Sequence, residues 1–163
     1  MKKLSASNRK VLTPGEKTLN WLYEEQLRVD PEWSVRFSGG FTWWADQHAQ
    51  TVEIVASEKD ENGAIADLIC VSTDLVRGLE LTDQRHDSLA LLMSCASMAG
   101  PVYDPKNGSL RLCSTARVNE ENYPLLRSLI SVASVLQIAE VRKFADDTFG
   151  WRYVLADLRS WAG

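Results

Sequence analysis

Alternating apolar and polar positions in the middle of the chain predict two long β-strands. Apolar and polar residues alternate from 51 to 57 (TVEIVAS), and a second strand pattern with many β-branched residues runs from 66 to 76. The segment between them, 58–63 (EKDENG), is charged and ends in Asn-Gly, which favours a tight turn. The pattern therefore predicts an antiparallel hairpin with one buried face.

Shorter strand patterns lie on both sides of this hairpin. A strand candidate at 33–37 is joined by Ser38-Gly39-Gly40 to a strand at 41–45. Further along, 102–103 and 110–115 flank a turn that contains both Pro and Asn-Gly. These segments predict one more hairpin and an extension of the central sheet.

Two amphipathic helices are predicted before the last part of the chain. The first has an N-cap at Thr13, Pro14 at its first position and Glu16 three residues after the cap, and should stop before Asp30-Pro31. The second begins at Thr82 or Asp83 and ends at Gly100-Pro101. Its apolar residues fall at helical spacing: Leu89, Leu92, Met93, Ala96 and Ala99.

A third, long helix is capped by Asn119, with Glu120 and Glu121 in its first turn. One side carries Leu125, Leu129, Val132, Val135, Leu136 and Ala139, and Leu126, Ile130 and Ala133 widen it. One sheet cannot cover so broad an apolar surface. We therefore expect deep burial, or contact of part of the stripe with a second subunit. In either case Leu129→Asp should unfold the domain or split a dimer.

These elements predict an α+β fold: a helix, three antiparallel strands, a helix, a two-strand hairpin and a long helix, with one sheet covered by helices. The 163 residues suit a single domain at 13–163 after a flexible tail at 1–12, with 149–163 as an aromatic C-terminal extension. A net charge of −4 and a pI near 5.2 disfavour nucleic-acid binding. We expect a cytoplasmic protein, because neither a signal peptide nor an uncharged spanning segment is evident.

Candidate catalytic and metal-binding residues are few. Cys70, Cys95 and Cys113 are far apart in the sequence and lie in apolar patterns, which argues against a disulfide framework, a zinc site or a reactive thiol. His48 and His86 lack the spacing of metal ligands. The acid pairs at 60–61 and 146–147 lie in polar runs typical of solvated loops. We therefore expect no enzyme activity, no catalytic residues, no metal and no cofactor.

Aromatic residues near the start of the sheet are the candidate partner contacts. Trp43 and Trp44 place one indole on each face of their strand, so at least one large ring is expected at the surface. With Trp33 and Phe41 they form a candidate partner-binding set. The alternative is that one indole packs in the core and the other lies under a helix or loop.

Three segments carry a family resemblance: TDLVRG at 73–78, YDPKNGSLRL at 103–112, and VNEENYPLLRSLISVASVLQIAE at 118–140. In this order, and with the WW pair, the chain from Pro14 to Phe144 resembles the type III secretion chaperone-like superfamily, in particular bacterial YbjN-type domains and related uncharacterised bacterial proteins. The resemblance implies a small, acidic, mostly dimeric protein that binds other polypeptides and catalyses no reaction. The aromatic tail after Gly150 departs from the family pattern.

Two functional hypotheses follow. The first is a homodimeric, chaperone-like module that uses an exposed sheet face or edge to hold an extended segment of another protein. The second is a small-ligand binder or enzyme with a pocket between the sheet and the long C-terminal helix. An exposed apolar groove would favour the first, and a pocket with converging polar groups would favour the second.

Overall fold

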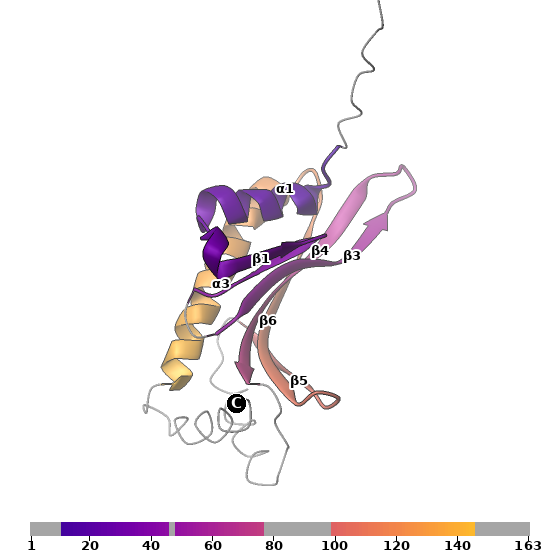
Figure 1. Cartoon of the computed structure of the whole chain (residues 1–163). Coiled ribbons are helices and arrows are strands. Elements are labelled where there is room, and N and C mark those ends of the chain that lie inside the picture. The colour runs from indigo at the N-terminus through magenta and orange to yellow at the C-terminus, as the bar shows by residue number, and fades with distance from the viewer. Residues whose placement is uncertain (1–10, 46–47, 77–98, 146–163) are drawn as a thin grey trace, which may run out of the picture.

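A computed structural model describes residues 11–45, 48–76 and 99–145 (Figure 1). Their elements are, in order, α1 (Pro14–Trp21), a π-helical turn (Leu22–Gln26), a 3-10 turn (Pro31–Trp33), β1 (Ser34–Phe37), β2 (Gly40–Trp43), β3 (Gln50–Lys59), β4 (Ile65–Val76), β5 (Gly100–Asp104), β6 (Ser109–Val118) and α3 (Tyr123–Ala145). The N-terminal tail through residue 10, most of the helix expected from Thr82 and the C-terminal extension fall outside the described residues.

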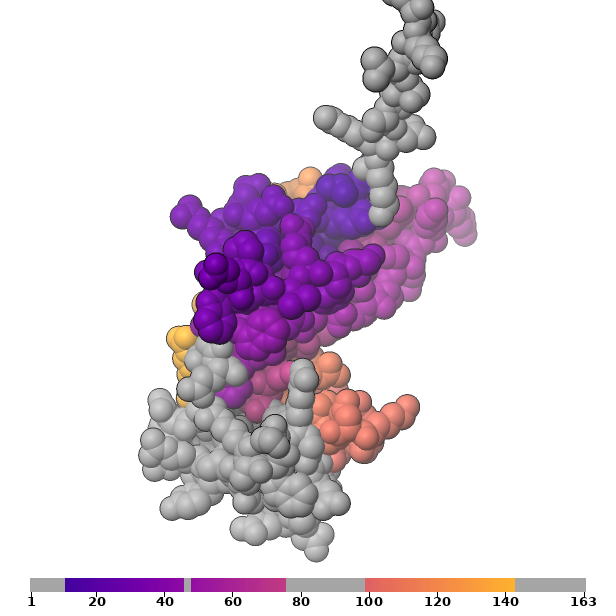
Figure 2. All heavy atoms as spheres, in the orientation of Figure 1, coloured from indigo at the N-terminus to yellow at the C-terminus, as the bar shows by residue number. Residues whose placement is uncertain are grey.

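The strands form one antiparallel sheet in the order β1-β2-β3-β4-β6-β5. This sheet, with an N-terminal helix and a long C-terminal helix packed on it, confirms the predicted α+β class. The short candidate at 33–37 is β1, so the sheet has six strands. The β3–β4 and β5–β6 hairpins lie where the sequence placed them, and their turns project from the body (Figure 2).

Both helices lie on the same face of the sheet (Figure 1). In β4 the odd-numbered residues from 67 to 75 are buried on this helix-covered face, and the even-numbered residues point to the opposite face. No helix of the described chain covers that second face. We call it the second face.

Helix α1 begins where the sequence predicted because its capping box is complete. The backbone N–H of Glu16 donates to Oγ1 of Thr13 at 3.2 Å, and the N–H of Thr13 donates to the Glu16 carboxylate at 2.9 Å. The helix is shorter than expected, because it passes into the π-helical turn and the chain then reverses near Arg28, whose φ is +48°.

A buried carboxylate holds the first turn of α1 on the sheet. Oδ2 of Asp67 accepts the N–H of Gly15 at 2.8 Å, and Oδ1 accepts the hydroxyl of Ser57 at 2.5 Å. A Cβ atom at position 15 would lie only 2.7 Å from the Asp67 Cβ. Glycine is therefore required here for close approach of helix and strand.

The hydrophobic core lies between α1, the π-helical turn and the centre of the sheet, with α3 closing one side. It contains an edge-to-face pair, Tyr23 and Phe41, whose ring centroids are 5.2 Å apart. The other buried members come from these elements and from the loop after the π-helical turn: Leu19, Leu22, Val29, Val52, Ile69, Val71, Val118 and Ile130.

Candidate protein-binding surface

The side of α3 that faces the sheet is largely polar. Gln137 is fully buried; its Nε2 donates to the carbonyl oxygen of Val71 at 3.0 Å and to Oγ of Ser114 at 2.9 Å. Its Oε1 accepts the hydroxyl of Thr73 at 2.8 Å. The amide group therefore joins the helix to both β4 and β6.

A second buried amide completes this network from β3. Nε2 of Gln50 donates to Oγ1 of Thr73 at 2.8 Å and to the carbonyl oxygen of Ser134 at 3.0 Å. Its Oε1 accepts the indole N–H of Trp43 at 3.0 Å and the hydroxyl of Ser134. Because every polar atom of both amides has a partner, the network is stable in the interior and fixes the rotation of α3 about its axis.

With its polar side held inward, α3 turns large aliphatic side chains outward. Leu125, Leu129, Val132 and Val135 are 69, 56, 48 and 53% exposed. The expectation of deep burial is wrong for these four side chains, which we call the outer stripe. The reason is that the serine and glutamine side chains on the other side of the helix find hydrogen-bond partners on the sheet. Contact of the stripe with a second subunit stays a prediction.

By length and composition alone, the stretch Tyr123–Arg142 would also be sufficient to cross a membrane. In this fold the helix is hydrogen-bonded to β3, β4 and β6.

An open apolar groove of about 310 Å³ lies beside the outer stripe, between α3 and the sheet. The helix contributes Leu126, Leu129, Ile130 and Ala133, and the strands contribute Ile69, Val71, Ser114, Thr115, Ala116 and Arg117. Leu129 belongs to both the groove and the stripe, so the two form a continuous apolar surface.

One wall of the groove is a strand with an unfilled edge. β4 pairs with β6 from Leu110 to Val118, whereas β5 pairs only with 109–113. Within the described chain, residues 115–118 therefore have no strand partner on the β5 side. Such an edge presents backbone N–H and C=O groups that an added strand can bind.

The four aromatic residues chosen from the sequence have different environments. Trp33 is 64% exposed, Trp44 is also exposed, and the N–H of Trp44 donates to the carbonyl oxygen of Trp33 at 3.0 Å. Trp43 is half-buried and is engaged by Gln50. Phe41 is only 1% exposed, so its selection as a contact residue is corrected: its ring is packed against Tyr23 and cannot reach a partner.

The exposed aromatic pair is remote from the groove along the sheet. Trp33 and Trp44 flank β1 and β2, at the opposite end of the strand order from β6 and β5. The structure therefore does not combine these aromatic residues and the α3 groove into one site.

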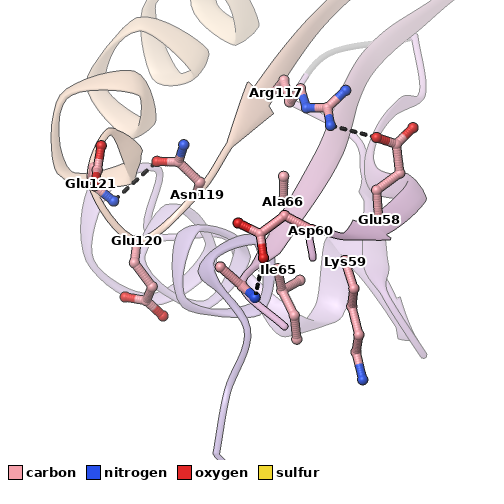
Figure 3. A pocket seen from close by; sticks show the side chains of 10 residues that line it. Glu58, Lys59, Asp60, Ile65, Ala66, Arg117, Asn119, Glu120 and Glu121 are labelled. Carbon is pink, nitrogen blue, oxygen red and sulfur yellow. Dashed lines mark hydrogen bonds and ion pairs between the residues drawn. The ribbon is translucent and has the colours of Figure 1, made fainter. Parts of the chain in front are cut away.

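A polar depression of about 550 Å³ lies between the β3–β4 turn and the start of α3 (Figure 3). Its polar groups stabilise local structure. Oδ1 of Asp60 accepts the N–H groups of Asn62 and Ala64, Asn119 accepts the N–H of Glu121 at 3.0 Å, and Arg117 pairs with Glu58. Asn119 thus caps the first turn before α3, as predicted, although regular helix begins at Tyr123.

The other residues considered for chemistry are dispersed. Nδ1 of His48 hydrogen-bonds to the carbonyl oxygen of Asp74 at 3.0 Å. His86, Cys95, Asp146 and Asp147 lie outside the described residues. Within the described chain, no three or more His, Cys, Asp or Glu residues are grouped as metal ligands.

The inward polar side of α3 was not predicted from the sequence, whereas a pocket between the sheet and this helix was part of the second functional hypothesis. A signal was present, because Ser131, Ser134 and Gln137 recur every three residues within an otherwise apolar helix. The same spacing identifies the side that needs hydrogen-bond partners.

No family model, curated protein or solved structure matches this chain.

Proposed function

We propose that this protein is a non-enzymatic, chaperone-like binding module that acts as a homodimer and holds a segment of another polypeptide. The observation that carries the proposal is the rotation of α3, which buries amides and exposes the outer stripe. A helix on the surface of a monomer normally has the opposite arrangement. Burial of these aliphatic side chains against protein would yield about 1.5–3 kcal/mol for each one fully covered.

The dimer contact is assigned to the part of the stripe that lies away from the groove. Leu125, Val132 and Val135 do not line the groove and are exposed. A second copy packed on them would leave the groove accessible. The same helix could then serve both contacts.

The held segment is assigned to the groove, where it would extend the sheet. An extended peptide along residues 115–118 of β6 would pair with the unfilled edge, and alternate side chains would enter the apolar lining. This binding mode requires apolar residues at every second position of the bound segment and places little constraint on the rest of its sequence. It suits a chaperone-like role and a cytoplasmic protein without a cofactor.

The dimer is tested by light scattering coupled to size-exclusion chromatography. Wild type should have the mass of two chains, and Val135→Asp should have the mass of one, with its circular dichroism unchanged. Ser128→Asp is the matched control, because Ser128 is exposed on the same helix but is already polar. A monomeric wild type, or equal effects of the two variants, would contradict the dimer.

The groove is tested by photo-crosslinking in lysate, with benzoylphenylalanine at position 126 or, as the control, at position 128. Position 126 should give adducts with other polypeptides, and Ala133→Glu should remove them by placing a charge in the groove. Adducts of equal yield at position 128 would show that the labelling is not specific to the groove.

A small apolar ligand is the second candidate for the same groove. Its volume of about 310 Å³ lies at the lower end of typical ligand sites, and the lining offers few polar groups to orient a substrate. Titration with a fluorescent long-chain fatty acid distinguishes the two roles. Saturable binding by wild type, lost in Ala133→Glu, together with no polypeptide adduct, would favour the ligand.

A further inference from the structure

Two cysteines that are distant in the sequence are neighbours on the second face of the sheet. Cys70 of β4 lies opposite Thr115 of β6, and Ser72 lies opposite Cys113. The two cysteines are therefore diagonal neighbours on hydrogen-bonded strands, two positions out of register and on the same side of the sheet. Both are only partly buried.

Each thiol affects the ionisation of the other. Hydrogen bonding between them is the main cause that lowers the pKa of Cys113 to about 7 and raises the pKa of Cys70 well above its usual range. The thiolate is thus favoured on Cys113, with Cys70 as the proton donor. A thiolate, not a thiol, is the attacking species in disulfide exchange.

Charged neighbours on three strands modulate this pair. Arg111 of β6 favours the Cys113 thiolate, Asp74 of β4 disfavours it, and Glu53 of β3 disfavours a charge on Cys70. β5 places Gly100 opposite Cys113 and brings no titratable group there. The positive charge of Arg111 and the Cys70 hydrogen bond together outweigh the effects of burial and of Asp74.

We propose that Cys70 and Cys113 form a redox-active dithiol, which closes to an intramolecular disulfide by exchange with a low-molecular-weight disulfide such as oxidised glutathione. The Cys113 thiolate attacks one sulfur of the disulfide, and one glutathione leaves as a thiolate that takes up a proton. Cys70 then gives up its proton and attacks the Cys113 sulfur, which releases the second glutathione. The pair loses two electrons and two protons, and one oxidised glutathione becomes two thiols.

The diagonal arrangement makes this bond reversible. Diagonal neighbours in a sheet are somewhat farther apart than directly opposed residues, near or beyond the upper limit of ordinary disulfide geometry. Closure must draw β4 and β6 together at this point. A disulfide strained in this way is reduced more readily than a structural one.

The test is equilibration of the whole protein in mixtures of reduced and oxidised glutathione, followed by acid quenching, alkylation of free thiols and peptide mapping. Oxidising mixtures should produce a Cys70–Cys113 crosslinked peptide, and reducing mixtures should remove it. The same crosslink should form in Cys95→Ser. Only mixed glutathione adducts, or a crosslink through Cys95, would overturn the proposal.

A second measurement tests the roles of the two thiols without requiring the crosslink. The rate of iodoacetamide alkylation at Cys113 should be half-maximal near pH 7. Cys70→Ala should slow this alkylation at neutral pH by about tenfold or more, because the hydrogen bond to the thiolate is lost. Cys70→Ser, which keeps a hydroxyl donor, should slow it less. Equal rates in all three proteins would show that Cys70 does not activate Cys113.

Discussion

Nε2 of Gln137 donates to the backbone carbonyl oxygen of Val71 at 3.0 Å, and this contact holds the polar side of α3 against the sheet. The apolar positions of the helix outnumber the polar ones, yet hydrogen-bond partners, not hydrophobicity alone, determine which side is buried. A buried amide without partners costs more than an aliphatic side chain left in water.

Replacement of Gln137 by Leu should lower the free energy of unfolding by about 2–4 kcal/mol, because Thr73, Ser114 and the Val71 carbonyl lose a partner in the interior. Urea denaturation measures this as a lower midpoint with an unchanged slope. Ser128→Ala, an exposed change on the same helix, should have little effect. An unchanged urea midpoint in Gln137→Leu would mean that this amide group does not hold α3 on the sheet.

Gly15→Ala should destabilise the protein by about 1–3 kcal/mol, because the new methyl group would lie 2.7 Å from Cβ of Asp67 and 2.8 Å from Cδ1 of Ile54. Gly100→Ala is the control, since a Cβ atom there meets nothing within 4 Å. Thermal unfolding compares the two variants. Equal transition temperatures would contradict the close approach of α1 to β4.

Leu129→Asp should leave the domain folded, because the side chain is more than half exposed in the monomer. The new charge should instead weaken binding in the groove, which Leu129 lines, and weaken the dimer, whose contact residues Leu125, Val132 and Val135 it borders. Circular dichroism and sedimentation equilibrium on one sample separate the two effects. Loss of the circular dichroism signal would indicate that Leu129 is buried after all.

Phe41→Ala should cost about 3–5 kcal/mol of stability through loss of its contact with Tyr23 and the cavity that remains. Trp33→Ala should change the free energy of unfolding by less than about 0.5 kcal/mol, as expected for an exposed side chain. Denaturant titrations of both variants check the distinction between a core aromatic residue and a surface one.

Stability should rise as the pH increases from about 7 to 9, where folding releases a proton from Cys113. Its pKa is 9.0 without the fold's influence and about 7 in the folded protein, so in this range the unfolded chain binds more protons. This contribution is complete above pH 9 and is lost as the pH falls through 7. Above pH 9 the raised pKa of Cys70 acts in the opposite direction. Urea midpoints across this range, measured under reducing conditions, should vary less in Cys113→Ser.

Local signals in the sequence were sufficient for much of the fold. The alternation in β3 and β4, the Asn-Gly turn between them and the capping box at Thr13 depend on neighbouring residues, and the structure contains all three. The rotation of α3 had only the spacing of its serine and glutamine residues as a local signal, because the hydrogen-bond partners of Gln137 come from strands that are distant in the sequence. The proximity of Cys70 and Cys113 likewise follows only from the register of β4 with β6.

The contacts that hold α1 in place come from residues much later in the sequence. Gly15 depends on Asp67, and Lys17 forms an ion pair with Glu120 at 2.8 Å. During synthesis α1 emerges from the ribosome before β4 and the start of α3, so it cannot make these contacts until they have emerged as well. Its native position therefore depends on residues far along the chain.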